Sequence, residues 1–209
     1  MPVEVSSSDG ARTLVIACGA LAKEILALIQ LNGWTHLSLT CLPAIWHNTP
    51  EKIPEGIRTK IHAAKESYDR ILVAYGDCGT GGLLDQVLEE EGVERIDGPH
   101  CYAFFYGLAP FLKWADEEPT SFYLTDYLVR HFDRLIIQGL GLDRHPELLP
   151  MYFGNYRKLV YLAQTEDPKL AERAQVAADQ LSLTFEHHVT GYGELSEFLA
   201  PTHSKSLAN

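Results

Sequence analysis

The chain has 209 residues, of which 46% are hydrophobic, and a formal net charge of −11. This length is enough to bury a core, and the hydrophobic fraction excludes a disordered chain. The negative charge argues against binding to nucleic acid or to an anionic membrane. No apolar run approaches the roughly 20 residues of a membrane span, and the N-terminal segment lacks an apolar signal core, so we expect a cytoplasmic protein with no membrane contact.

Short apolar runs alternate with longer helical patterns along the chain. The predicted strands are residues 13–17, 37–41, 70–75, 93–96, 158–163 and 184–189. The predicted helices are residues 21–31, 54–67, 83–91, 101–114, 121–135, 169–181 and 193–199. Continuous apolar strands separated by helices are typical of a parallel sheet that is covered on both faces. The sequence therefore predicts a doubly wound α/β fold with a mostly parallel sheet and helices on both faces.

The domain organisation follows from the same pattern. We expect a flexible N-terminal arm over residues 1–12, a single α/β domain over residues 13–200, and a flexible tail over residues 201–209. The loops and helices from about residue 115 to 157 are expected to form a small helical lobe.

Three of the four cysteines follow predicted strands. Cys18 comes directly after the first strand, Cys78 lies just beyond the strand 70–75, and Cys101 lies in the turn after the strand 93–96. Parallel strands end at one edge of the sheet, where ligands bind near the topological switch point, so these thiols are expected to converge. Cys41 lies between Thr40 and Leu42 without a neighbouring glycine and is interpreted as a packed strand residue.

Three converging thiolates would suit zinc or another thiophilic metal. They would leave a fourth position for water, a substrate or another side chain, as in catalytic zinc sites. Without an export signal, thiols or metal ligands are expected rather than a disulfide framework. The alternative is that each cysteine simply fills space in the core, which is common for buried free cysteine.

A glycine-rich turn, residues 75–82 (YGDCGTGG), joins a predicted strand to a predicted helix. Backbone N–H groups in such a turn can bind an anion at the positive end of the helix. The spacing fits neither the Walker nor the dinucleotide pattern, so an anionic or carboxylate-bearing ligand is favoured over a nucleotide. The alternative is a tight connection without a ligand. The predicted binding residues are Gly76, Gly79, Thr80, Gly81 and Gly82.

Polar side chains near the cysteines are candidates for proton transfer or ligand binding. His100 adjoins Cys101 and is a candidate metal ligand or base, and His47 is expected at the same edge of the sheet. Asp77 and Asp85 flank the glycine-rich turn and are candidates for orienting a ligand. For Asp77, capping of the following helix is the alternative role.

Several segments, taken together, carry a family resemblance. They are residues 14–24 (LVIACGALAKE), 42–44 (LPA) with 47–48 (HN), 75–79 (YGDCG), 99–101 (PHC) and 122–125 (FYLT). In this order, from about residue 13 to 199, the chain resembles domain-of-unknown-function family 1638. The family pattern includes cysteines that match Cys18, Cys78 and Cys101, and none that matches Cys41. The resemblance thus implies a three-cysteine site. Members of this family are often encoded near corrinoid-dependent methyltransferases, so the resemblance also implies that the chain takes part in methyl-group or methylamine metabolism.

Three hypotheses follow for the function. The first is a zinc-binding protein of the zinc-dependent methyltransferase type, in which Cys18, Cys78 and Cys101 bind the metal and His100, His47 or Asp77 serves the reaction. The second is a non-catalytic accessory protein that docks on a corrinoid protein or a methyltransferase. In that case the chain contacts a corrinoid only through its partner. The third is a purely structural metal domain. A small-molecule substrate or methyl carrier is the expected ligand, and a homodimer is the default assembly.

Overall fold

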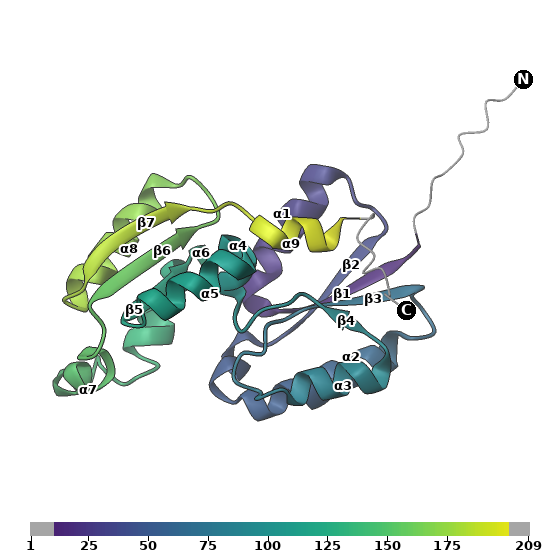
Figure 1. The fold of residues 1–209 in the computed structure, drawn as a ribbon, viewed down its shortest axis with the longest axis horizontal. Helices are drawn as coiled ribbons and strands as arrows, with labels where there is room; N and C mark the ends of the chain where they lie inside the picture. Colours follow the sequence, from purple (N-terminus) through teal and green to yellow (C-terminus); the bar gives the residue numbers. More distant parts are fainter. Residues whose placement is uncertain (1–10, 201–209) are drawn as a thin grey trace, which may run out of the picture. The chain divides into compact units, whose positions relative to one another are not determined.

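The computed structural model describes residues 11–200, which form two compact units (Figure 1). The first unit consists of residues 11–100 with 195–200, and the second of residues 101–194. Each unit contains one sheet, and both sheets are entirely parallel, which confirms the predicted α/β class and strand direction. Most of the expected arm over 1–12 and the whole expected tail over 201–209 lie outside the described residues.

The sheet of the first unit has the strand order β2-β1-β3-β4. Its strands are β1 (Thr13–Cys18), β2 (Leu37–Leu42), β3 (Arg70–Ala74) and β4 (Glu94–Arg95). The chain passes from β1 to β2 on one side and then returns to place β3 on the other side of β1. This change of direction creates a topological switch point between the carboxyl ends of β1 and β3, which is where ligands bind in open α/β sheets.

Helices cover both faces of this sheet. Figure 1 shows α2 (Ile53–Ala64) and α3 (Leu83–Glu91) on one face, and α1 (Ala22–Asn32) with α9 (Gly193–Leu199) on the other. The helix α2 forms here because apolar residues recur every four positions, and this places Ile53, Ile57 and Ile61 on one buried stripe. Burying each isoleucine contributes about 1.5–3 kcal/mol relative to leaving it exposed. The same core layer includes Cys78 and is contacted by Cys18.

The sheet of the second unit has the strand order β5-β6-β7. Its strands are β5 (Ser121–Thr125), β6 (Lys158–Ala163) and β7 (Thr184–Val189). One face packs on α6 (Asp126–Arg130) and α8 (Pro168–Gln180), where alternate residues of β6 such as Leu159 and Tyr161 are buried. The other face carries an aromatic cluster that joins Tyr123 of β5 to residues of α4 (Cys101–Tyr106) and α5 (Leu108–Glu117).

Two predicted helices differ from the structure. The predicted helix 121–135 begins as the strand β5, because residues 121–125 alternate between the two faces of the sheet and Leu124 is completely buried there. The rest of the expected lobe is helical, with α6, a π-helical turn (Asp133–Ile137) and α7 (Leu149–Phe153). The predicted helix 101–114 is divided at Gly107, whose φ of 95° ends α4.

Within the described residues, no helix combines the length and the apolar character that crossing a membrane requires.

Candidate functional site at the switch point of the first sheet

The switch point of the first sheet carries two thiols. Cys18 is the last residue of β1, and Cys78 lies four residues beyond the end of β3. Strand alternation places Cys18 on the same face as Ile16, which is the face covered by α2 and α3. The Cys18 thiol packs against the core cluster that contains the side chain of Tyr75, the residue that follows β3. The ends of two adjacent strands thus hold the two thiols at one edge.

The backbone of Cys78 has a left-handed conformation, with a φ of 48°. This conformation is costly for a residue with a Cβ atom, and the surrounding contacts hold it in place. The N–H of Cys78 donates to the carbonyl of Pro99 at 2.8 Å, and the N–H of Asp77 donates to that of Gly98 at 3.1 Å. A Cβ atom on Gly76 would lie 3.0 Å from the Cα atom of His100, so glycine is needed there for the two segments to meet. Backbone strain of this kind is concentrated at functional sites.

Burial keeps both thiols protonated. It raises the pKa of Cys78 to about 12, and the nearby charges of Cys18 and Asp77 act in the same direction. Burial also raises the pKa of Cys18. Two neighbouring thiolates would repel each other, and this repulsion helps to keep the thiols protonated. A cation bound between them would offset the repulsion and displace both protons.

The carboxylate of Asp77 organises the glycine-rich turn. It accepts hydrogen bonds from the N–H of Gly82 at 2.9 Å, from the N–H groups of Gly79 and Gly81 at 3.2 Å, and from the hydroxyl of Thr80 at 2.6 Å. Burial opposes its ionisation, but these donors outweigh that effect and lower the pKa of Asp77. Three of the five residues that were predicted to bind a ligand anion, Gly79, Gly81 and Gly82, therefore donate their N–H groups to a carboxylate of the chain itself.

Two histidines lie together near this edge. His47, on a short 3₁₀ helix after β2 (Ala44–Asn48), and His100 have ring centroids 6.0 Å apart. Burial lowers the pKa of both rings, and the charge of His47 lowers that of His100 further, while Asp77 has the opposite effect. Both imidazoles are consequently neutral near pH 7, which leaves each with a nitrogen lone pair.

The remaining cysteines have different places. Cys41 alternates with Leu42 along β2, so its side chain lies on the face of the sheet opposite to that of Cys18. Cys101 is the first residue of α4, in the second unit, and directly follows His100 in the chain. In the part of the chain that the structure describes, no three His, Cys, Asp or Glu side chains are grouped closely enough to hold a metal ion. The donor types suit a thiophilic metal, and two of the three predicted thiols share one edge of the first sheet.

A family model matches residues 41–199, about three quarters of the chain, and its description is "Protein of unknown function (DUF1638)". The chain belongs to the DUF1638 family. The match includes the glycine-rich turn, Cys78, Cys101 and both histidines of the pair, whereas Cys18 precedes it. None of the curated proteins compared with the sequence matches it.

Sequence reasoning missed the arginine that shapes the turn before His100 in this DUF1638 protein. The guanidinium of Arg95 in β4 donates two hydrogen bonds to the carboxylate of Asp85 in α3, at 2.5 and 3.0 Å. It also donates to the backbone carbonyls of Ile96 and Gly98, at 2.9 and 3.3 Å. Asp85, a candidate for orienting a ligand, is thus part of an ion pair. An arginine in a two-residue strand gives no recognisable pattern, because the contact depends on how α3 packs beside β4.

A buried carboxylate in the second unit was also missed. Asp126 is completely buried after β5 and accepts hydrogen bonds from the hydroxyl of Tyr161 at 2.7 Å and from that of Thr165 at 2.6 Å. It also accepts from the N–H of Gln164 at 3.1 Å and forms an ion pair with Arg130 at 3.2 Å. The only signal in the sequence is the spacing of four between Asp126 and Arg130 on one helix, which is common on helix surfaces.

Proposed function

We propose that this protein binds a thiophilic metal ion, zinc in the first instance, through Cys18 and Cys78 at the switch point of the first sheet. The observation that carries the proposal is the left-handed backbone of Cys78, on the same edge as Cys18. Glycine would be less strained here; core packing gives a reason for a buried side chain at this position, but no reason for a thiol in particular. Metal binding gives that reason, because it requires the thiol.

The environment of the thiols supports a cation as the ligand. Neither thiol ionises readily by itself, because burial raises the pKa of both Cys18 and Cys78. A divalent cation provides the compensating charge and converts both thiols to thiolates. Zinc and other thiophilic metals gain most from sulfur ligands, whereas magnesium and calcium prefer oxygen.

The other ligands come from the neighbouring donors. The neutral rings of His47 and His100 are suitable nitrogen donors near this edge. Cys101, the third predicted thiol, follows His100 directly, and its participation stays a prediction of the sequence. A coordination position left to water or to an external thiol would allow the metal to act as a Lewis acid.

The family resemblance supports a setting in corrinoid-linked methyl-group or methylamine metabolism. Two roles fit the metal site there: a metalloenzyme of the methyltransferase type, and an accessory protein that docks on a corrinoid protein or methyltransferase. The hydrogen bonds of Asp77 favour the accessory role, because they use the N–H groups that an anionic substrate would need. Thermal-shift measurements with amines, thiols and methylated thiols distinguish the roles, since only a small-molecule site produces stabilisation that increases with ligand concentration.

Cobalt(II) titration tests metal binding, because thiolate coordination produces a charge-transfer absorption in the near ultraviolet. We expect Cys18→Ser and Cys78→Ser to weaken metal affinity by more than roughly a hundredfold, since loss of only an outer partner of a metal ligand costs 10–100-fold. Cys41→Ser is the matched control, because this thiol lies on the other face of the sheet. Equal affinity in all three variants would contradict the proposal. Cys101→Ser decides whether the third predicted thiol takes part.

A further inference from the structure

The strand β7 forms one edge of the second sheet, and its outer side pairs with no strand in the part of the chain that the structure describes (Figure 1). An open edge can pair with a strand of another chain, and proteins usually protect it with lysine, proline or a very short strand. The six residues of β7 (TFEHHV) include neither lysine nor proline. Among the described edge strands β2, β4, β5 and β7, only β7 has exposed side chains, those of Thr184, His187 and Val189.

The backbone of β7 directs every second residue toward this open edge. The N–H groups of Thr184 and Thr190 donate on the side of β6, to the residue before that strand and to its last residue, at 3.0 and 2.9 Å. Backbone groups alternate in direction along a strand of a parallel pair. The N–H and C=O groups of Phe185, His187 and Val189 therefore point outward, where a further strand would bind.

The side chains of β7 are held in place on both faces of the sheet. On the face of α4 and α5, His188 contacts the carboxylate of Glu186 at 2.5 Å, and its ring centroid lies 5.0 Å from that of Trp114. On the face of α6 and α8, His187 stacks on Tyr161 with ring centroids 5.0 Å apart and an interplanar angle of 14°. A strand added at this edge would thus meet side chains in defined positions.

From this arrangement we propose that β7 pairs antiparallel with β7 of a second copy of the chain, about a two-fold axis at His187. Such an axis makes every contact occur twice and closes the assembly as a dimer. His187 then lies opposite its own copy and Phe185 opposite Val189, so that all the outward N–H and C=O groups obtain partners. An aromatic residue opposite a β-branched one is a favourable cross-strand pair. This interface is independent of the metal proposed for the first unit.

The side chains favour this register over its neighbours. It places Glu186 opposite His188 of the second copy, a carboxylate opposite an imidazole. A symmetric pair can change register only in steps that keep each side chain on its own face. One step in one direction places Glu186 opposite Glu186, and like charges directly opposite each other destabilise a sheet. One step in the other direction places Phe185 opposite Gly191, which removes its apolar partner.

Size-exclusion chromatography with light scattering tests the proposal on the full chain, under reducing conditions so that the cysteines cannot cross-link the copies. We expect twice the chain mass of 23.3 kDa, and dissociation on dilution. His187→Lys and His187→Glu should each raise the dissociation constant of the dimer roughly tenfold or more, because each places like charges opposite each other at the axis. An equimolar mixture of these two variants should restore the dimer, since opposite charges then meet there.

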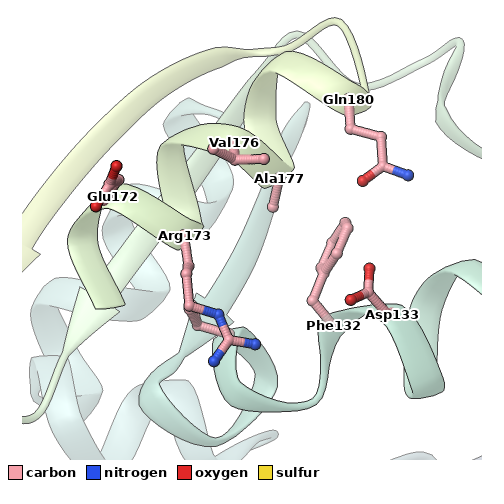
Figure 2. A pocket seen from close by; sticks show the side chains of 8 residues that line it. Phe132, Asp133, Glu172, Arg173, Val176, Ala177 and Gln180 are labelled. Atoms are coloured by element: carbon pink, nitrogen blue, oxygen red, sulfur yellow. The ribbon is translucent and has the colours of Figure 1, made fainter. Parts of the chain in front are cut away.

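Two further variants locate the interface. Val189→Lys should also weaken the dimer, and it keeps the test valid if the His187 variants do not unfold cooperatively. Val176→Lys is the control, because Val176 is 58% exposed, close to the 56% of Val189, but lies on α8 beside a hollow of about 240 Å³ near Phe132 (Figure 2).

Three outcomes would overturn the proposal. A monomer at every concentration would leave the edge of β7 to a strand of another protein. A dimer that is lost in Val176→Lys but kept in Val189→Lys would place the interface on α8. A mixture of cooperatively folded His187→Lys and His187→Glu proteins that stays monomeric would exclude a two-fold axis at His187.

Discussion

The carboxylate of Asp77 lies 2.9 Å from the backbone nitrogen of Gly82 and accepts its hydrogen bond. Gly82 immediately precedes α3, so this N–H belongs to the positive end of the helix. In a phosphate-binding loop the corresponding N–H groups bind the ligand. Here the chain provides the anion itself, so these N–H groups have an acceptor without any ligand.

We expect Asp77→Ala to destabilise the protein by about 1–3 kcal/mol, because several donors of the turn lose a charged acceptor. Urea unfolding near neutral pH measures the change. Thr80→Val removes one donor to the same carboxylate and should cost less than Asp77→Ala. If both variants were as stable as the original protein, Asp77 would not organise the turn.

Replacement of Cys78 tests the strain in its backbone. Glycine normally destabilises a folded chain relative to alanine by roughly 0.5–1 kcal/mol. At a φ of 48° the order should reverse, with Cys78→Gly more stable than Cys78→Ala by about 1 kcal/mol. Both variants lose the thiol and its packing, so the comparison isolates the backbone. A Gly variant that is less stable than the Ala variant would mean that the left-handed conformation carries no penalty.

The order of strands and helices was largely predictable, because it depends on local patterns. The strands 158–163 and 184–189 and the helix 83–91 have the predicted bounds. The first of these is a continuous apolar run and the helix is amphipathic, so each ends at a change of pattern. The helical interpretation of residues 121–125 was wrong because five residues give too short a window to separate the period of a strand from that of a helix. The division of the strands between two sheets depends on long-range packing and leaves no local pattern.

The candidate site was predictable only in part. The rule that parallel strands end at one edge placed Cys18 and Cys78 together, because Cys18 ends β1 and Cys78 follows β3, and these strands are neighbours in the sheet. The same rule could not foresee that Asp77 would use the N–H groups of its own turn, since that depends on the φ angles of Cys78 and the following glycines. Nor could it foresee the buried Asp126, whose partners Tyr161 and Thr165 come from another strand and the loop after it.

Glu91 at the end of α3 gives a pH-dependent contribution to stability. Lys65, His62 and Arg58 of the α2 segment contact its carboxylate at 2.5, 2.8 and 2.9 Å, and together they lower its pKa from 4.5 to about 2. A carboxylate with a lowered pKa stabilises the fold fully above its unfolded pKa and loses this effect as the pH falls toward the folded value. The contribution should therefore disappear between about pH 4.5 and pH 2.

The matched variant for this prediction is Glu91→Gln, which keeps the shape of the side chain without its charge. Urea unfolding of both proteins at about pH 5.5 and about pH 3 should give a stability difference that is larger at the higher pH. Glu89→Gln on the same helix is the control, because no ion pair is formed by Glu89 among residues 11–200. A difference independent of pH would show that Lys65, His62 and Arg58 act on Glu91 only through packing.

The buried carboxylate of Asp126 should be the most sensitive polar group of the second unit. Asp126→Asn leaves the nearby Arg130 without its counter-charge and replaces an acceptor of several hydrogen bonds by an amide, so we expect a loss of about 3–5 kcal/mol. Tyr161→Phe removes only one donor to the same carboxylate, at 2.7 Å, and should cost about 1–3 kcal/mol. The double variant should be more stable than the sum of the two losses predicts, because the hydrogen bond between the two side chains would be counted twice. Urea unfolding of the four proteins measures this coupling, and strictly additive losses would exclude a shared network.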